Sequence, residues 1–417
     1  GKGLMMTLKL FRNARIYTPI DRGKPLAGNE MGCLAVMEDG AFVVDGGYIA
    51  GIGKEQEILE SLRSSKAIEE TDLEGRCVIP GFVDPHTHAC FVGTREREFV
   101  MRLQGASYLD ILKMGGGILS TVDKVRSASK DKLYENTKEV VARAAKSGIT
   151  TMEIKSGYGL SLEHEIKMLE VIGQLKGDPL DVVPTFMGAH AIPREYKDNT
   201  EAYVELVINE MIPYVAEHKL AKYCDVFCED GVFSVEDARR ILLAARKYGL
   251  GLKLHADEVY DLGGAKLAAE LKVDSAEHLL AASDEGLRAM AQSGVLAVLL
   301  PATAFSLKKP FARARKMIEL GVPVALATDC NPGSCYCESM EMVYRLAVLG
   351  MGLSMEEALT ASTVNAAYAI GMGNLVGSLQ RGKKADFVVL EGDTPGVMAY
   401  HLGTSNVKEV YKMGKKI

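Results

Sequence analysis

The segment CVIPGFVDPHTHACFVGTREREF (77–99) places two histidines, His86 and His88, directly after an apolar run. Side chains at positions i and i+2 of a β-strand point to the same face. If the apolar run is a strand, both imidazoles project together from its end, and this arrangement suits a metal ion. A polar pair satisfied by hydrogen bonds is the ordinary alternative, so the remainder of the chain has to distinguish the two.

The composition favours a protein with a small-molecule partner. The 417 residues carry a formal net charge of −6, and no block of Lys and Arg is long enough to indicate binding to nucleic acid or to an anionic membrane. No apolar run reaches the roughly 18 residues of a membrane span, and the start GKGLMMTLKLF lacks the order of a secretory signal. We expect a cytoplasmic protein without nucleic-acid or membrane partners, and the composition leaves open whether it forms a homodimer.

The two ends of the chain both have the character of short strands separated by turns. CLAVMEDGAFVVDGGYIAGIG (33–53) contains Asp-Gly and Gly-Gly steps, which are typical of hairpins, and VGSLQRGKKADFVVLEG (376–392) has a similar pattern. Neither end has enough apolar positions for a core of its own. We therefore expect residues 1–80 and 376–417 to pack together as one composite β-sandwich domain.

Residues 81–375 alternate short strand-like runs with helical stretches, which is typical of repeated βα units and a parallel sheet. One helical stretch, SMEEALTASTVNAAYAIG (354–371), begins with Ser354 and Glu357 at the spacing of a capping box. Eight such units favour a (β/α)8 TIM-type barrel over an open sheet. The eight strand candidates are VIPGFVDPHTH (78–88), GITTMEIKSGYG (148–159), DVVPTFMGAH (181–190), CDVFCEDG (224–231), GLKLHADE (251–258), VDSAEHLL (273–280), GVLAVLLPATAF (294–305) and VPVALATDC (322–330).

Unusual polar residues stand at the C-terminal ends of these strands, where barrel enzymes place their active sites. A single strand-end histidine is most simply a core residue bonded to a backbone carbonyl, but five histidines in such positions make five separate explanations improbable. The strand-end residues are His86, His88, His190, His255, Glu258, Glu277, His278 and Asp329.

The ends of the first, fifth and eighth strands can converge at the mouth of a closed barrel. His86, His88, His255 and Asp329 then offer three imidazoles and a carboxylate to one divalent metal ion. Nitrogen-rich ligation suits zinc or ferrous iron better than magnesium or calcium. A metal lowers the pKa of bound water from about 15.7 to about 7, so hydrolysis is the expected chemistry. Glu229 on the fourth strand is a bridging ligand in principle, but a site with one metal is the simpler interpretation.

The motifs PGFVDPHTH, HADE, AEHL, ATDCNPGS and GSLQRGKKADFVVL resemble the amidohydrolase superfamily over essentially the whole chain. The local sequences HTHACFVGTREREF, EIKSGYGL, TFMGAHAIP and TDCNPGSCYCESM resemble more closely its imidazolonepropionase family. This resemblance implies hydrolysis of 4-imidazolone-5-propanoate to N-formimidoyl-L-glutamate in histidine degradation. It also implies metal ligation by the three imidazoles and the carboxylate named above.

The resemblance further implies a set of substrate contacts. A guanidinium can hold a propanoate carboxylate with two charge-assisted hydrogen bonds, so Arg95 suits this role, whereas its neighbour Arg97 is more simply a solvated residue. The implied substrate-binding residues are Arg95, Tyr108, Tyr158, His190, Glu258, Asn331, Gly333 and Ser334.

Ring opening requires water to attack the ring carbonyl carbon and a proton to reach the leaving nitrogen. We expect Glu258 to take the proton from water and deliver it to nitrogen, and His278 to orient the nucleophile or stabilise the oxyanion. Asp329 is both a predicted ligand and a candidate proton acceptor. The sequence leaves the division of proton transfer between these groups open.

Two other functions fit part of the pattern. Deaminases of purine or pyrimidine bases use a similar set of histidines and carboxylates, but a neutral base does not need the carboxylate clamp that Arg95 offers. A non-catalytic metal-binding barrel would leave Glu258 and His278 without a purpose.

Overall fold

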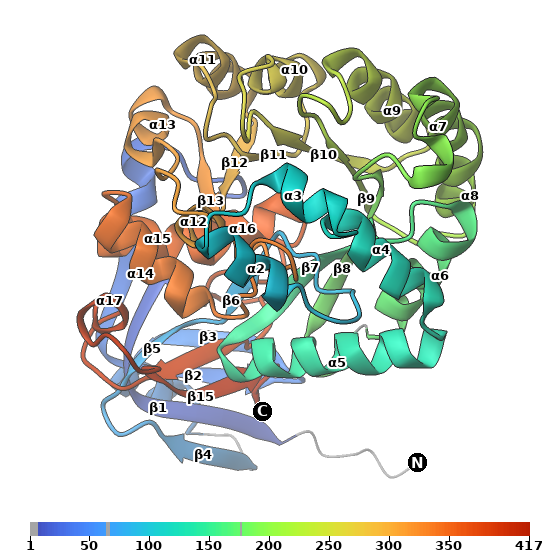
Figure 1. The fold of residues 1–417 in the computed structure, drawn as a ribbon. Helices are drawn as coiled ribbons and strands as arrows, with labels where there is room; N and C mark the ends of the chain where they lie inside the picture. Colours follow the sequence, from blue (N-terminus) through green and yellow to red (C-terminus); the bar gives the residue numbers. More distant parts are fainter. Residues whose placement is uncertain (1–6, 64–66, 176) are drawn as a thin grey trace.

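The structure, a computed structural model, describes residues 7–63, 67–175 and 177–417. It consists of a (β/α)8 barrel and a mixed β-sheet that is built from both ends of the chain (Figure 1). The fold class predicted from the sequence is confirmed.

Eight parallel strands form the barrel wall in the order in which they follow one another along the chain. Seven of these strands lie within segments expected from the sequence, and β9 (Tyr223–Phe227) begins one residue before its expected segment, 224–231. Their bounds are β6 (Phe82–Asp84), β7 (Ile149–Lys155), β8 (Asp181–Ala189), β9 (Tyr223–Phe227), β10 (Gly251–Ala256), β11 (Ser275–His278), β12 (Leu296–Leu299) and β13 (Val324–Leu326).

Hydrogen bonds at the C-terminal ends of the strands join β13 to β6. The backbone N–H of Asp329 donates to the carbonyl of His86 at 3.0 Å, and that of His88 donates to the carbonyl of Cys330 at 2.8 Å. The Asp84 carboxylate accepts from the backbone N–H of Thr328 at 3.0 Å and from its hydroxyl at 2.5 Å. The first and last strands are therefore joined beside the paired histidines.

Helices surround the barrel, and their buried faces follow helical spacing (Figure 1). In α9 (Val235–Lys247), the buried residues are Ala238, Ile241, Leu242 and Ala245, which recur on one face. The other barrel helices are α2 (Glu96–Leu103), α3 (Tyr108–Lys113), α4 (Ile118–Ser127), α5 (Lys130–Lys146), α6 (Leu162–Gln174), α7 (Thr200–Leu206), α8 (Ile212–Glu217), α10 (Gly264–Leu271), α11 (Asp284–Ser293), α12 (Pro301–Ser306), α13 (Ala314–Leu320), α14 (Met340–Gly350), α15 (Met355–Ser362) and α16 (Val364–Ala369).

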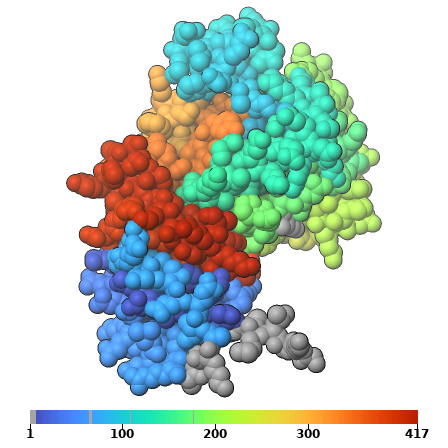
Figure 2. Space-filling model, turned by 90° about the horizontal axis from the view of Figure 1, so that it is seen from below, coloured from blue at the N-terminus to red at the C-terminus, as the bar shows by residue number. Residues whose placement is uncertain are grey.

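The second sheet combines strands from both ends of the chain. Its order is β16-β15-β14-β5-β1-β2-β3, and β4 pairs with β1. Figure 2 shows the C-terminal residues packed directly against the N-terminal ones. The strands are β1 (Leu8–Pro19), β2 (Leu34–Asp45), β3 (Tyr48–Lys54), β4 (Ile68–Asp72), β5 (Cys77–Pro80), β14 (Phe387–Leu390), β15 (Val407–Lys412) and β16 (Lys415–Lys416), and this part also holds α1 (Glu55–Ser61) and α17 (Val397–Tyr400).

Aromatic residues form the core of this sheet. The ring centroids of Phe42 on β2 and Phe387 on β14 lie 4.9 Å apart, although β1 and β5 separate these strands in the sheet order. Since neighbouring strands are about 4.8 Å apart, the contact requires the sheet to fold around itself. The predicted β-sandwich is therefore one sheet that encloses its own core. The limits predicted for it, residues 1–80 and 376–417, stay a prediction, and the first six residues lie outside the described part.

Ion pairs attach the sheet to the N-terminal end of the barrel. Asp181, at the start of β8, lies 2.8 Å from the Lys384 Nζ and 2.7 Å from the Lys412 Nζ. The capping box predicted at Ser354 and Glu357 is present at the start of α15. Among the described residues, no helix combines the length and apolar character needed to cross a membrane.

Candidate active site

Four side chains from three strands meet at the C-terminal end of the barrel. His86 and His88 follow β6, His255 lies on β10, and Asp329 follows β13. The Nε2 atoms of His86 and His88 lie 3.1 and 3.4 Å from Asp329 Oδ1. The ring centroid of His255 lies 4.7 Å from that of His86 and 5.6 Å from that of His88. The structure therefore brings together the four residues that the sequence analysis selected as ligands.

The donor atoms of this group fit a divalent metal ion. One nitrogen from each of His86, His88 and His255 lies within 4.8 Å of the other two. Within the described part of the chain, both ring nitrogens of His86 and the Nδ1 of His88 are buried without a hydrogen-bond partner, which is costly unless something else binds them. Burial lowers the pKa of both histidines, so they are neutral, the form that binds metals.

A cation would stabilise the ionised form of the carboxylate in this group. Burial, together with the charge of Glu258, raises the pKa of Asp329 to about 8. A cation among the donors would offset this effect because it stabilises the ionised carboxylate. A metal ion is therefore the species that the buried imidazoles and the buried carboxylate fit together.

The backbone and a neighbouring hydroxyl orient Asp329. Asp329 and His278 both have left-handed backbone conformations, with φ of 55° and 76°, which are uncommon for residues other than glycine. The Thr303 hydroxyl donates to Asp329 Oδ2 at 2.8 Å, while Oδ1 faces His86 and His88. The sequence analysis did not identify Thr303, because a threonine in a short apolar helix carries no signal of its own.

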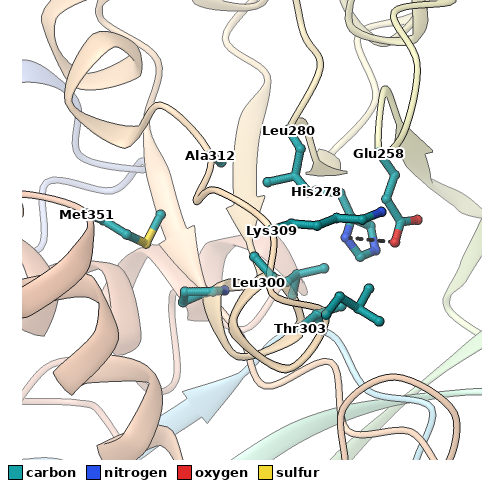
Figure 3. A pocket seen from close by; sticks show the side chains of 11 residues that line it. Glu258, His278, Leu280, Leu300, Thr303, Lys309, Ala312 and Met351 are labelled. Atoms are coloured by element: carbon teal, nitrogen blue, oxygen red, sulfur yellow. Dashed lines mark ion pairs between the residues drawn. The ribbon is translucent and has the colours of Figure 1, made fainter. Parts of the chain in front are cut away.

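Glu258 and His278 form one wall of the site (Figure 3). The His278 Nδ1 lies 3.5 Å from Glu258 Oε1, and the His278 Nε2 lies 3.9 Å from Asp329 Oδ2. Burial raises the pKa of Glu258. Its Oε2 is buried and has no hydrogen-bond partner among the described residues. Glu258 therefore keeps one carboxylate oxygen able to exchange a proton.

Arg95, which precedes the first turn of α2, packs against the loop that follows β13. The guanidinium occupies the space that a Cβ at position 333 would need, so a larger residue at Gly333 would displace the Arg95 side chain. The Arg95 Nε lies 3.4 Å from Glu98 Oε1, and the Arg102 Nη2 donates to the Gly333 carbonyl at 3.0 Å. Arg95, Gly333 and Ser334 line a cavity of about 540 Å³. This guanidinium can bind an anionic group.

Tyr158 and His190 lie side by side next to His88. The side chain of Tyr158 is buried, and the His190 ring stacks on the His88 ring with centroids 4.8 Å apart. The His190 Nδ1 is 2.9 Å from the carbonyl of Gly157. The loop that carries Tyr158 is held by the Glu165 carboxylate, which accepts from three backbone N–H groups at 2.9 to 3.2 Å. The two residues form a rigid wall of the site.

The side chain of Asn331 shapes the loop after β13. Its Oδ1 accepts from the backbone N–H groups of Gly333 at 2.9 Å and Ser334 at 2.8 Å, and its Nδ2 donates to the Asp329 carbonyl at 2.7 Å. In this structure the Asn331 amide therefore makes its hydrogen bonds within the loop. The substrate contacts expected from these three residues stay a prediction.

Two further sequence expectations need comment. The side chain of Tyr108 lies outside the described part of the structure, so its substrate contact also stays a prediction. Glu229, considered as a bridging ligand, instead accepts hydrogen bonds from the backbone N–H groups of Val259 at 2.9 Å and Asp230 at 3.0 Å. It anchors the loop that carries Glu258.

A cluster of buried charges lies behind the histidines, and the sequence analysis assigned no role to most of it. The Lys155 Nζ is 2.5 Å from Glu153 Oε2 and 2.9 Å from Asp225 Oδ2, and the Lys253 Nζ is 3.4 Å from Glu277 Oε1. All five side chains are fully buried. The feature of the sequence that could have revealed this cluster is a charged residue in the middle of a strand that is otherwise apolar.

Comparison with known proteins identifies the family of the chain. A model of the amidohydrolase family matches residues 77–417. Imidazolonepropionase from Syntrophobacter fumaroxidans is 58% identical over 98% of this chain and 96% of its own length. Imidazolonepropionase from Desulfotalea psychrophila is 56% identical over 99% of this chain and 100% of its own length. The chain belongs to the imidazolonepropionase family of amidohydrolases. The resemblance inferred from the motifs is confirmed.

Solved structures of other amidohydrolases share the fold of this imidazolonepropionase family member. Guanine deaminase from E. coli covers 99% of this chain and aligns over 99% of its own length, with a TM-score of 0.71 and 16% identity. An adenosine deaminase from Xanthomonas campestris covers 98% of this chain and aligns over 92% of its own length, with a TM-score of 0.71 and 18% identity. At such identities these proteins support the fold and not the substrate.

The ligand assignment predicts how metal content responds to mutation. Replacing His255 by Ala removes one of three imidazoles. We therefore expect the metal content of the purified protein to fall from about one ion per chain to a small fraction of that. Elemental analysis by mass spectrometry measures the content. His218→Ala is the control, since this exposed ring stacks on Tyr214 away from the site. Full metal content in His255→Ala would contradict the assignment.

Proposed function

We propose that this protein hydrolyses the ring of 4-imidazolone-5-propanoate to N-formimidoyl-L-glutamate, a step of histidine degradation. The observation that carries the proposal is the placement of a metal-type donor set and the Arg95 guanidinium at the same end of the barrel, in a chain of the imidazolonepropionase family. The substrate has a part that matches each of these features: a cyclic amide for the metal centre and a carboxylate for Arg95. A cytoplasmic location follows from this place in amino-acid breakdown.

In this proposal one divalent ion, zinc or iron, would be held by His86, His88, His255 and Asp329. Such an ion makes a water molecule acidic enough to act as a nucleophile at neutral pH. The water oxygen attacks the ring carbonyl carbon, the bond from this carbon to the ring nitrogen breaks, and the nitrogen takes up a proton. The new carboxylate and the formimidoyl group belong to one open-chain product.

Glu258 is the residue best placed to move the proton. Its Oε1 lies 3.5 Å from the His278 Nδ1, and its Oε2 is buried without a hydrogen-bond partner among the described residues. Burial raises the pKa of this carboxyl, which makes it a better proton acceptor than an exposed carboxylate. In this proposal His278 donates to the developing oxyanion, and Asp329 is a second proton acceptor besides its role as a ligand.

Arg95 binds the propanoate carboxylate in this proposal. Its side chain is 16% exposed, so a substrate carboxylate would be largely shielded from water when paired with it. Tyr158 and His190 form the wall against which the ring lies. Tyr108, Asn331, Gly333 and Ser334 complete the proposed set of substrate contacts, and Glu258 also touches the ring.

Deamination of a nucleobase is the alternative that the same metal centre allows. Its support is the shared fold of distant deaminases, and a neutral base has no anionic group for Arg95 to bind.

A substrate assay tests the proposal directly. Incubation of the metal-loaded protein with 4-imidazolone-5-propanoate should remove the ultraviolet absorbance of the ring and yield an equal amount of formimidoyl-glutamate. Guanine, adenosine and cytosine serve as alternative substrates, with ammonia release as the readout. Ammonia from a base without ring opening of the imidazolone would replace the proposal by the deaminase function.

Replacement of Glu258 by Gln should abolish most of the turnover. The amide cannot exchange the proton, so we expect kcat to fall by about 10²- to 10⁴-fold while metal content stays unchanged. Steady-state kinetics with elemental analysis separate the two effects. The exposed Glu285→Gln is the control. Near-normal turnover in Glu258→Gln would remove this residue from the mechanism.

Replacement of Arg95 by Gln should weaken substrate binding more than catalysis. Losing a charge-assisted pair costs about 1.5–3 kcal/mol, so we expect KM to rise by about 10- to 100-fold with a smaller change in kcat. The matched control is Arg97→Gln, because this neighbouring arginine is exposed. Equal KM values for the two variants would argue against the carboxylate contact.

A further inference from the structure

We propose that Asp225, held in place by Lys155, is a positioning residue that fixes which ring nitrogen of His255 faces the metal ion. This inference rests on the metal centre of the proposed function, and it assigns a purpose to part of the buried charge cluster. Asp225 lies in the middle of β9, and among the described residues no hydrogen bond or ion pair joins its side chain to a predicted substrate-binding residue.

The two carboxylate oxygens of Asp225 have different partners: Oδ1 is hydrogen-bonded, and Oδ2 is ion-paired without a hydrogen bond of its own among the described residues. Oδ1 lies 2.9 Å from the His255 Nδ1, and Oδ2 lies 2.9 Å from the Lys155 Nζ. Asp225 and Lys155 are fully buried, and His255 is 2% exposed. Because water does not reach the group, these contacts persist rather than exchange with solvent.

The contact with Asp225 selects one form of the imidazole. A neutral histidine ring has one N–H donor and one nitrogen with a free lone pair. The carboxylate accepts only, so Nδ1 must carry the proton, and the lone pair is left on Nε2, toward His86 and His88. A carboxylate or carbonyl behind a metal-binding histidine generally has this effect.

The ring of His86, by contrast, is not held by a hydrogen bond of this kind in the described part of the chain. Its Nδ1 lies 3.6 Å from Glu277 Oε1, longer than a normal hydrogen bond, and neither of its ring nitrogens has a hydrogen-bond partner among the described residues. Glu277 can therefore assist His86 only weakly in this geometry. His255 is the ligand that the protein orients in advance.

Lys155 holds the carboxylate in the orientation that His255 requires. Its ammonium also pairs with Glu153, which accepts from the Thr185 hydroxyl at 2.7 Å and from the Thr87 backbone N–H at 3.1 Å. Contacts within β7 and with β8 thus fix the ammonium, and the ammonium fixes Asp225 Oδ2 on β9. A buried carboxylate paired in this way does not carry an uncompensated charge.

The same residues are close enough to suggest a second metal site. One donor atom from each of His86, Asp225 and Glu277 lies within 4.8 Å of the others. The ammonium groups of Lys155 and Lys253 already pair with these two carboxylates. The geometry therefore points to one metal ion per chain. The carboxylates of Asp225 and Glu277 contact the histidine ligands and do not bind a second ion.

Zinc affinity of an Asp225→Asn variant tests the inference. The amide keeps the shape of the side chain but offers one acceptor oxygen where the carboxylate offers two. It therefore cannot serve both His255 and Lys155. We expect the Kd for zinc, measured by competition with a chromophoric chelator, to rise by about 10- to 100-fold with one zinc per chain at saturation.

Glu341→Gln is the matched control. This buried carboxylate on α14 accepts from the backbone N–H of Asn406 at 2.9 Å and has no contact with the histidines. Its zinc affinity should equal that of the wild type, even if its thermal stability falls. Unchanged zinc affinity in Asp225→Asn would overturn the inference, and so would two zinc ions per wild-type chain.

A measurement on the wild type covers the case in which Asp225→Asn does not fold. In the zinc-loaded protein with nitrogen-15 histidine, NMR should find a proton on Nδ1 of His255 and the metal on Nε2, assigned by loss of the signal in His255→Asn. The reverse arrangement would overturn the inference. Failure to hydrolyse the imidazolone would affect only the proposed function, because these readouts do not depend on turnover.

Discussion

Closure of the barrel between β13 and β6 is the constraint on which the site depends. The hydrogen bonds that join these strands involve Asp84, Thr328 and the backbones of His86 and Asp329, so the closing contacts and the proposed ligands occupy the same few positions. A wall that failed to close would separate the paired histidines from the carboxylate that faces them. A metal ion bound to both sides would stabilise the closed barrel by mass action, since it binds only the closed form.

Behind the ligands, the barrel interior contains buried charged side chains in place of the apolar side chains that usually fill such an interior. Burial alone would raise the pKa of Asp225 and lower that of Lys155, but the neighbouring His255 and the carboxylates reverse both shifts, so the two groups are ionised. An apolar replacement of similar volume often stabilises such a region. The charges therefore make sense as a device that holds His255 in one orientation, at a cost in stability.

Much of this arrangement could be predicted from the sequence because the informative residues stand at strand ends. His86, His88, His255 and Asp329 each interrupt an apolar run, and counting eight such runs is enough to place them around one opening. Asp225 and Lys155 were visible as charges within strands, but only the closed structure tells which residue lies across the interior. The roles of Thr303, on the short helix α12, and of Glu229, in a loop, depend on how these segments fold back on the site, which spacing along the chain does not encode.

The strand order of the terminal sheet has a consequence for the synthesis of the chain. β5 pairs with β1 on one side and with β14 on the other, and the whole barrel lies between β5 and β14 in the sequence. On the ribosome, the N-terminal strands must therefore wait for several hundred residues of translation before their partner emerges. During that interval β5 presents an unpaired edge, which is where a chaperone or a wrongly paired nascent chain would bind.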